Sequence, residues 1–70
     1  MYNYNKLLGK IKEVYGTQDE FAKKLGISRT TLSQRLNGKL EFSQSEISNS
    51  LILLKIPFSE VEEYFFTLKV

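Results

Sequence analysis

Residues 18–38, QDEFAKKLGISRTTLSQRLNG, contain the pattern that decides the fold of this 70-residue chain. Apolar side chains recur at helical spacing on both sides of Gly26, which predicts two short helices joined by a tight turn. Glycine lets a chain reverse within a few residues without strain, and the small Ala22 lets the two helices approach each other. The apolar residues that would set the angle between the helices are Phe21, Leu25, Ile27, Leu32 and Leu36. This order of residues predicts a helix-turn-helix.

The sequence on either side predicts further helices with well-marked ends. A first helix, which stops at Gly16, would bury Tyr4, Leu7, Leu8, Ile11, Val14 and Tyr15. Later helices begin at a Ser or Thr cap, in most cases with a Glu three residues on: Thr17 with Glu20, Ser28, Ser43 with Glu46, and Ser59 with Glu62. A fourth helix must end before Pro57. The predicted fold is therefore all-α, a compact bundle of four to five short helices.

Composition limits the chemistry that the chain can perform. Residues 1–70 suffice for one small domain, which we predict to be a single helix-turn-helix domain. The sequence contains no cysteine and no histidine, so disulfides and thiolate or imidazole metal sites are excluded, and no cofactor is expected. The longest apolar run, residues 51–54, is far too short to span a bilayer, and residues 1–4 do not resemble a signal peptide. We therefore expect a cytoplasmic protein with no membrane partner and no small-molecule substrate.

The predicted third helix, residues 28–37, has a face that suits contact with the base edges of DNA. Thr30, Ser33 and Gln34 lie opposite its apolar side, where a merely solvated face would more often carry Glu and Lys. Gln suits adenine, Arg suits guanine and a Thr methyl suits thymine. Arg29 lies closer to the buried side, but its length lets it reach forward. The predicted base-reading residues are Arg29, Thr30, Ser33 and Gln34, and no acidic residue occurs between positions 27 and 40.

Charge is unevenly divided along the chain. Residues 1–40 carry eight Lys or Arg against three Asp or Glu, a net of +5, whereas residues 41–70 carry two against five, a net of −3. This division would let one face attract phosphates while the other repels them, although chance clustering on a solvated surface is the alternative. The candidate phosphate contacts around the third helix are Thr17, Gln18, Asn37, Lys39 and Ser43. Helix capping accounts equally well for Thr17 and Ser43.

The order Gln18, Ala22, Gly26, Ser28 and Asn37-Gly38 resembles the lambda-repressor-like, Cro/CI-type helix-turn-helix family. The RLNGK segment followed by FSQSEI is similar to small Cro-like proteins of Gram-positive prophages. The resemblance implies a homodimer that binds double-stranded operator DNA and represses transcription. It also implies base contacts from Arg29, Thr30, Gln34 and Ser33, and phosphate contacts from Gln18, Ser28, Asn37 and Lys39.

One residue departs from the pattern of this family. Arg35 takes a place where many members carry an aromatic or aliphatic side chain. We therefore expect the third helix to be less deeply seated, and we expect Arg35 to reach a phosphate.

The C-terminal segment, residues 58–70, contains more large apolar residues than one short helix can bury. Such a surplus predicts a dimer interface, formed by Tyr64, Phe66, Leu68 and Val70. A two-fold dimer would hold two recognition helices about 34 Å apart, which matches one turn of DNA. The alternative is that this tail folds back over the first helix and covers Tyr4 and Leu8.

Two other classes of function compete with DNA binding. An enzyme is disfavoured because the chain lacks His and Cys, and because Glu60, Glu62 and Glu63 simply complement a helix N-terminus. A protein-binding regulator, such as an antirepressor or an antitoxin-like module, is the stronger alternative. It would use the same helical surface to bind another protein, and the sequence does not exclude it.

Overall fold

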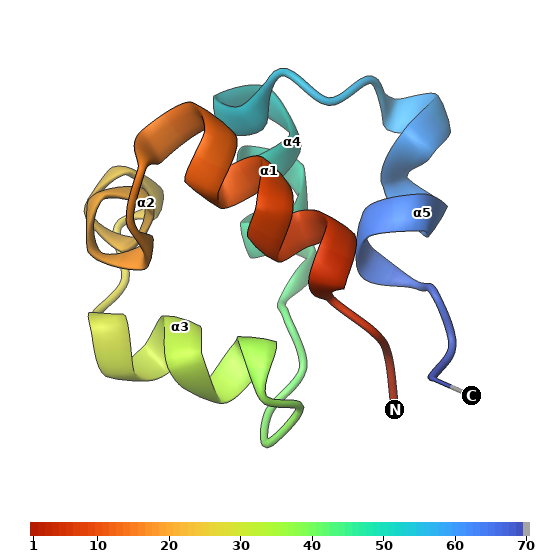
Figure 1. Cartoon of the computed structure of the whole chain (residues 1–70). Coiled ribbons are helices and arrows are strands. Elements are labelled where there is room, and N and C mark those ends of the chain that lie inside the picture. The colour runs from red at the N-terminus through yellow and green to blue at the C-terminus, as the bar shows by residue number, and fades with distance from the viewer. Residues whose placement is uncertain (70) are drawn as a thin grey trace.

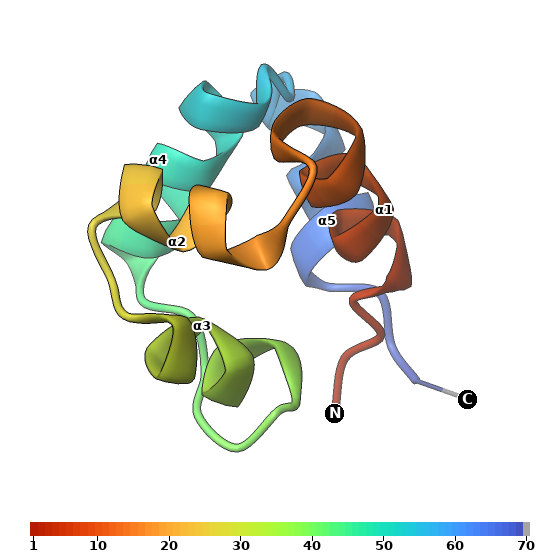
Figure 2. The same cartoon turned by 60° about the vertical axis from the view of Figure 1, so that its left-hand side comes forward.

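A computed structural model describes residues 1–69 of the chain and confirms the all-α fold. The elements are α1 (Asn5–Tyr15), α2 (Gln18–Leu25), α3 (Arg29–Leu36), α4 (Gln44–Leu54), the 3₁₀ turn η1 (Phe58–Glu60) and α5 (Val61–Phe65). In Figures 1 and 2, α1 runs between α2 and α5, and α3 lies at one edge of the bundle. Across residues 1–69, no helix has both the length and the apolar character needed to cross a bilayer.

The predicted helix starts are confirmed for three of the helices. The Thr17 hydroxyl accepts a hydrogen bond from the Glu20 N–H at 3.2 Å, and the Ser28 hydroxyl accepts one from the Thr31 N–H at 3.0 Å. Only Ser43 forms a reciprocal capping box, in which the Glu46 carboxylate also accepts from the Ser43 N–H at 3.0 Å. These caps satisfy backbone donors that the first turn of a helix leaves free.

The prediction that Ser59 caps the fifth helix is wrong. The Glu60 N–H donates to the Pro57 carbonyl at 2.9 Å, which closes a 3₁₀ turn over Phe58–Glu60. Ser59 therefore lies inside this turn, and α5 begins at Val61 with no side-chain cap. Proline favours this geometry because its ring holds φ near the value of −65° that Pro57 adopts.

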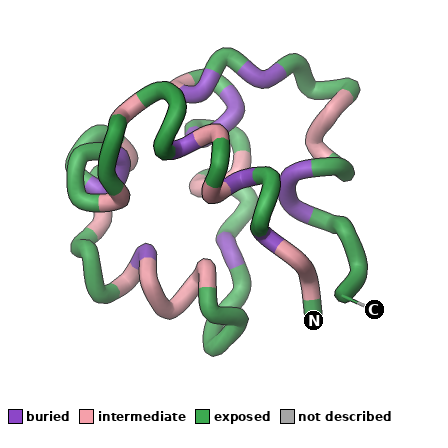
Figure 3. Tube along the Cα trace, in the orientation of Figure 1, coloured by how far each residue is buried: buried purple, intermediate pink, exposed green. Residues whose placement is uncertain are grey.

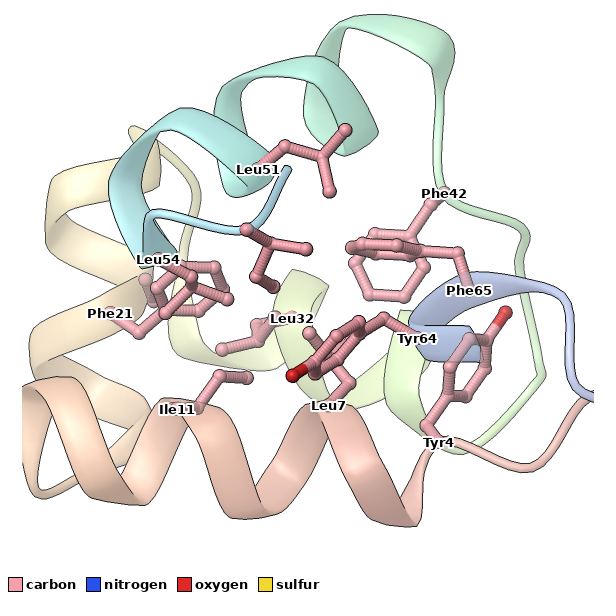
Figure 4. Packing of buried hydrophobic residues seen from close by; sticks show 12 residues of the cluster. Tyr4, Leu7, Ile11, Phe21, Leu32, Phe42, Leu51, Leu54, Tyr64 and Phe65 are labelled. Atoms are coloured by element: carbon pink, nitrogen blue, oxygen red, sulfur yellow. The ribbon is translucent and has the colours of Figure 1, made fainter. Parts of the chain in front are cut away.

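One core joins all five α-helices. Leu7 and Ile11 of α1 point toward Phe21, Leu32 and Leu54 (Figure 4), and all five side chains are at most 1% exposed. The aromatic rings of Tyr4, Phe42 and Phe65 pack edge to face, with centroids 5.4 and 5.2 Å apart. Val14 was expected in this core but is 42% exposed, because the last turn of α1 packs Tyr15 against Phe21 instead. The core thus holds α2 and α3 against α1 and α4.

The C-terminal tail returns to the N-terminus and pairs with residues 1–3, whereas the alternative to a dimer interface expected it to cover Tyr4 and Leu8 on the first helix. The Asn3 N–H donates to the Thr67 carbonyl at 2.7 Å, and the Lys69 N–H donates to the Met1 carbonyl at 3.0 Å. Figure 1 shows the two ends of the chain side by side. Tyr4 is buried at the start of α1, whereas Leu8 is half-buried.

This arrangement corrects part of the predicted dimer interface. Tyr64 is buried, because α5 packs against α1 and the Lys6 ammonium lies 4.9 Å from the centroid of the Tyr64 ring. Phe66 is 42% exposed and Leu68 is 69% exposed, so both remain accessible to a partner. Val70 lies outside the described residues. Fewer large apolar side chains of the C-terminal segment are therefore exposed than the sequence indicates.

Candidate recognition surface

The α2–α3 unit has the geometry of a helix-turn-helix. Gly26 adopts φ 84°, in the left-handed region that favours glycine, and its N–H closes α2 on the Ala22 carbonyl at 2.9 Å. The Ile27 N–H donates to the same carbonyl at 3.1 Å, so the chain reverses within a few residues. Leu32 is the only fully buried residue that α3 contributes (Figure 3). The side of α3 opposite Leu32 is therefore available for contacts.

The structure brings all four predicted base-reading residues together. They line one shallow, open depression on α3, together with two of the predicted phosphate contacts: Arg29, Thr30, Ser33, Gln34, Asn37 and Lys39. The Gln34 carbonyl accepts hydrogen bonds from the N–H groups of Lys39 and Leu40 at 3.0 and 3.3 Å. These hydrogen bonds stabilise the turn after α3 and keep Lys39 next to Gln34 on the α3 face.

Arg29 connects this face to the N-terminus of α2. It also borders a second depression, with Thr17, Gln18 and Lys12, between α1 and α2. The sequence interpretation missed Lys12, whose only signal was its contribution to the positive charge of residues 1–40. Thr17 and Gln18 therefore lie at the margin of the α3 face. A contact of either with phosphate remains a prediction.

Arg35, a predicted phosphate contact, is paired with Glu46 in the structure. Its Nε donates to Glu46 Oε1 at 2.9 Å and its Nη2 donates to Glu46 Oε2 at 3.2 Å. The two side chains are only 17% and 14% exposed, so this pair replaces the apolar contact expected at this place and ties α3 to α4. The hydrogen bonds raise the pKa of Arg35 and lower the pKa of Glu46. No local pattern in the sequence indicates that an acid on the next helix reaches back to α3.

Ser28 and Ser43 act first as helix caps. Besides capping, the Ser28 hydroxyl donates to the Thr31 hydroxyl at 2.9 Å, and the Ser43 hydroxyl is held in the capping box. Neither residue lines the two depressions described above. A contact of either with phosphate remains a prediction.

Carboxylates neutralise much of the positive charge in the first half of the chain. Within residues 1–69, five of the eight cations of the first forty residues lie within 4.0 Å of a carboxylate: Lys6, Lys10, Lys23, Arg29 and Arg35. The Arg29 guanidinium lies 3.8 Å from Asp19. Exposed pairs of this kind contribute little stability, but they reduce the local positive potential. The α3 face is therefore polar rather than strongly basic.

Comparison with known proteins places these features in a regulatory context. A family model described as "Protein of unknown function (DUF739)" matches residues 1–68. The solution structure of the modulator of repression (MOR) of the temperate bacteriophage TP901-1 from Lactococcus lactis is similar to this chain, with a TM-score of 0.84 and 40% identity over 99% of this chain and 93% of that chain. No protein with a curated description matches the chain. The comparisons support a phage regulator, but in a different family from the Cro/CI type.

Proposed function

The chain belongs to the DUF739 family, and we propose that it is a regulator that modulates repression by binding another regulatory protein, most simply a repressor. The observation that carries this proposal is the 40% identity to a phage modulator of repression over 99% of the chain. The proposal makes the chain a regulator of the bacterial cytoplasm and not an enzyme.

The charge of the α3 face supports a protein partner. A protein that binds DNA on its own gains much of its affinity from cations that displace counterions from phosphates. Arg35 is held by Glu46, and Arg29 lies beside Asp19. The other cation on this face is Lys39, and it has no carboxylate within 4.0 Å among residues 1–69. A single unpaired cation on the α3 face provides few phosphate contacts for a protein that binds DNA without a partner.

A gel-shift titration tests this proposal. The repressor encoded in the same genome as this chain is bound to its operator DNA, and this chain is added in increasing amounts. We expect the chain to change the fraction of DNA bound by the repressor, and to shift the operator weakly or not at all by itself. The proposal is wrong if the chain leaves the repressor unaffected over the whole titration.

Sequence-specific binding of double-stranded DNA by α3 is the second candidate. Its support is the acid-free α3 face, on which Arg29, Thr30, Ser33 and Gln34 surround one depression. Binding to an inverted-repeat operator would require a homodimer. A salt series of gel shifts with the chain alone separates the candidates, because contact with about six or more phosphates would give a log–log slope of about −5 or steeper. A flat response favours the protein partner.

A further inference from the structure

The turn that follows α3 contains an Asn–Gly pair, Asn37–Gly38, at one edge of the molecule (Figure 2). Asn37 is the residue at which α3 ends, and both residues are exposed. Gly38 adopts φ 77°, in the left-handed region, so the chain leaves the helical path here. The backbone after Asn37 is therefore neither buried nor part of a regular helix.

An asparagine in such a setting can react with its own backbone. The backbone nitrogen of the next residue loses its proton to hydroxide and attacks the side-chain carbon Cγ. A succinimide ring forms as the bond between Cγ and Nδ2 breaks, and Nδ2 leaves as ammonia with a proton from water. Water then adds to either ring carbonyl and opens the ring to aspartate or isoaspartate. The net reaction exchanges an amide and water for a carboxylic acid and ammonia, so it needs neither an oxidant nor a cofactor.

Gly38 removes the main obstacle to this attack. A side chain on the following residue crowds the approach of its nitrogen to Cγ, and glycine has no Cβ. The Gly38 N–H donates to the Arg35 carbonyl at 3.2 Å, at the long end of the usual range and at a helix end, where helices fray. Asn37 Nδ2 contacts the Ser33 hydroxyl at 3.4 Å, which is also long. Opening of this turn therefore frees both reacting groups by breaking two long hydrogen bonds.

The other three asparagines of the chain have protected settings: Asn3, Asn5 and Asn49. Asn49 lies inside α4, where the helical hydrogen bonds hold the N–H of the next residue, and that residue, Ser50, is buried. Asn3 Oδ1 accepts a hydrogen bond from the Asn5 N–H at 2.8 Å, and the residue after Asn3 is the buried Tyr4. Asn5 is the first residue of α1 and also precedes a long side chain. The chain therefore contains its own controls for the reactivity of Asn37.

Conversion of Asn37 would change the α3 face. Asn37 lines the depression on this face together with Arg29 and Lys39. Residues 27–40 contain no acid, so aspartate at this position would be the first carboxylate of the segment. Isoaspartate would also lengthen the main chain by one carbon atom, in the turn that keeps Lys39 next to Gln34. Both products lower the positive potential of the face.

We propose that Asn37 is a site of spontaneous deamidation, and that the carboxylate formed there weakens binding through the α3 face. The modification itself follows from the chemistry of the turn and does not depend on the proposed function. Its effect on binding rests on that function. Because the reaction needs only water and base, its extent is set by pH and by the age of the molecule.

Mass spectrometry and peptide mapping of the whole chain, after incubation at neutral and at alkaline pH, test the modification. We expect Asn37 to convert at least about tenfold faster than Asn49, because a turn at a helix end opens far more easily than a helix interior. Conversion should be faster at alkaline pH, because the Gly38 nitrogen must lose its proton. Equal rates at all four asparagines, or conversion of Asn37 only in denaturant, would overturn the inference.

Two variants test the effect on binding. Asn37→Asp carries the charge of the product, and Asn37→Gln is its uncharged match, whose longer side chain does not form the succinimide. In the repressor gel shift at low salt, we expect Asn37→Asp to need a severalfold higher concentration than Asn37→Gln for the same change, and this difference should shrink at high salt. Circular dichroism checks that both variants are folded. An equal or lower midpoint for Asn37→Asp would overturn the effect on binding.

Failure of this inference is distinguishable from failure of the proposed function. If the wild type has no effect on the repressor, the proposed function fails, and mass spectrometry still decides whether Asn37 deamidates. If the wild type acts on the repressor and the two variants act equally, the α3 face is not where the partner binds, while modulation of repression stands.

Discussion

Side chains on the α3 face differ in how much of their hydrogen-bonding capacity the fold already uses. Gln34 holds the following turn through its backbone carbonyl, so its side-chain amide is left for a partner. Asn37 Nδ2 lies 3.4 Å from the Ser33 hydroxyl, a long contact that a ligand can easily replace. Arg35 donates two of its hydrogen bonds to Glu46. This face therefore offers a partner fewer free hydrogen-bonding groups than its residue types indicate.

A pair of substitutions tests whether this face reads DNA. Gln34→Ala keeps the carbonyl that holds the turn, and if α3 reads bases it should reduce the preference for the selected sequence by about 1–3 kcal/mol. Lys39→Ala should weaken all sequences about equally and lower the salt slope by about 1. Gel shifts with selected and random DNA measure both effects. Identical behaviour of the two variants would contradict the division into base and phosphate contacts.

Lys55 is the one non-glycine residue with positive φ between Met1 and Lys69. It ends α4 at φ 56°, ψ 43°, a conformation that costs free energy for a residue with a Cβ. Lys55→Gly should therefore raise the free energy of unfolding by about 0.5–1 kcal/mol, and the Tm by a few degrees. Lys55→Ala is the matched control and should give no such gain. A lower Tm for Lys55→Gly would show that the Lys55 side chain makes a stabilising contact.

Among the elements, α3 packs against α2 and is also tied to α4 by an ion pair. Only Leu32 is fully buried on α3, and Leu36 packs against the core while partly exposed. The Arg35–Glu46 pair therefore adds a link between the end of α3 and the start of α4. Glu46 also accepts from the Ser43 N–H, so a single carboxylate holds both the start of α4 and the end of α3.

The pH dependence of stability tests this coupling. Hydrogen bonds from Arg35 are the main cause that lowers the pKa of Glu46 in the folded chain below its usual 4.5. A carboxylate with a lowered folded pKa stabilises the fold above its unfolded pKa, and this contribution is lost as the pH falls through the folded value. Thermal melts at pH 7 should show that Glu46→Gln costs about 1–3 kcal/mol.

The cost of Glu46→Gln should shrink as the pH falls below about 4.5, because the wild type then loses the same charge. Glu62→Gln is the control, since Glu62 is exposed and has no ion pair among residues 1–69. A constant difference between wild type and Glu46→Gln from pH 7 to pH 3 would contradict the role assigned to the pair.

At the scale of the whole molecule, the pairing of the two termini reduces the exposed surface available for self-association. The bridge between Tyr2 and Leu68 and the edge-to-face contact of Tyr2 with Phe66, at 5.5 Å between centroids, use part of the surface proposed for a dimer. We predict that a homodimer, if formed, uses the exposed parts of Phe66 and Leu68. Sedimentation over a wide concentration range, with and without operator DNA, measures this. Leu68→Ser should then shift the molecule to monomer, and only monomer in the wild type would exclude the dimer.

The sequence determined the helices and the helix-turn-helix, because these depend on local features. Gly26, the caps at Thr17, Ser28 and Ser43, and the apolar spacing act within a few residues along the chain. The gathering of Arg29, Thr30, Ser33 and Gln34 on one face was also predictable, since one helix carries them all. The 3₁₀ turn at Phe58–Glu60 was not, because a capping pattern at Ser59 competes with the constraint that Pro57 imposes.

Only the tertiary structure decided how distant residues meet. The pairing of Arg35 with Glu46, the burial of Tyr64 under Lys6, and the return of the tail to residues 1–3 join parts of the chain that local patterns do not relate. The same packing leaves Phe58 79% exposed, although it is a large apolar side chain. Whether a side chain is buried, paired or exposed depends on which distant residues the fold places next to it. Local sequence patterns do not specify those contacts.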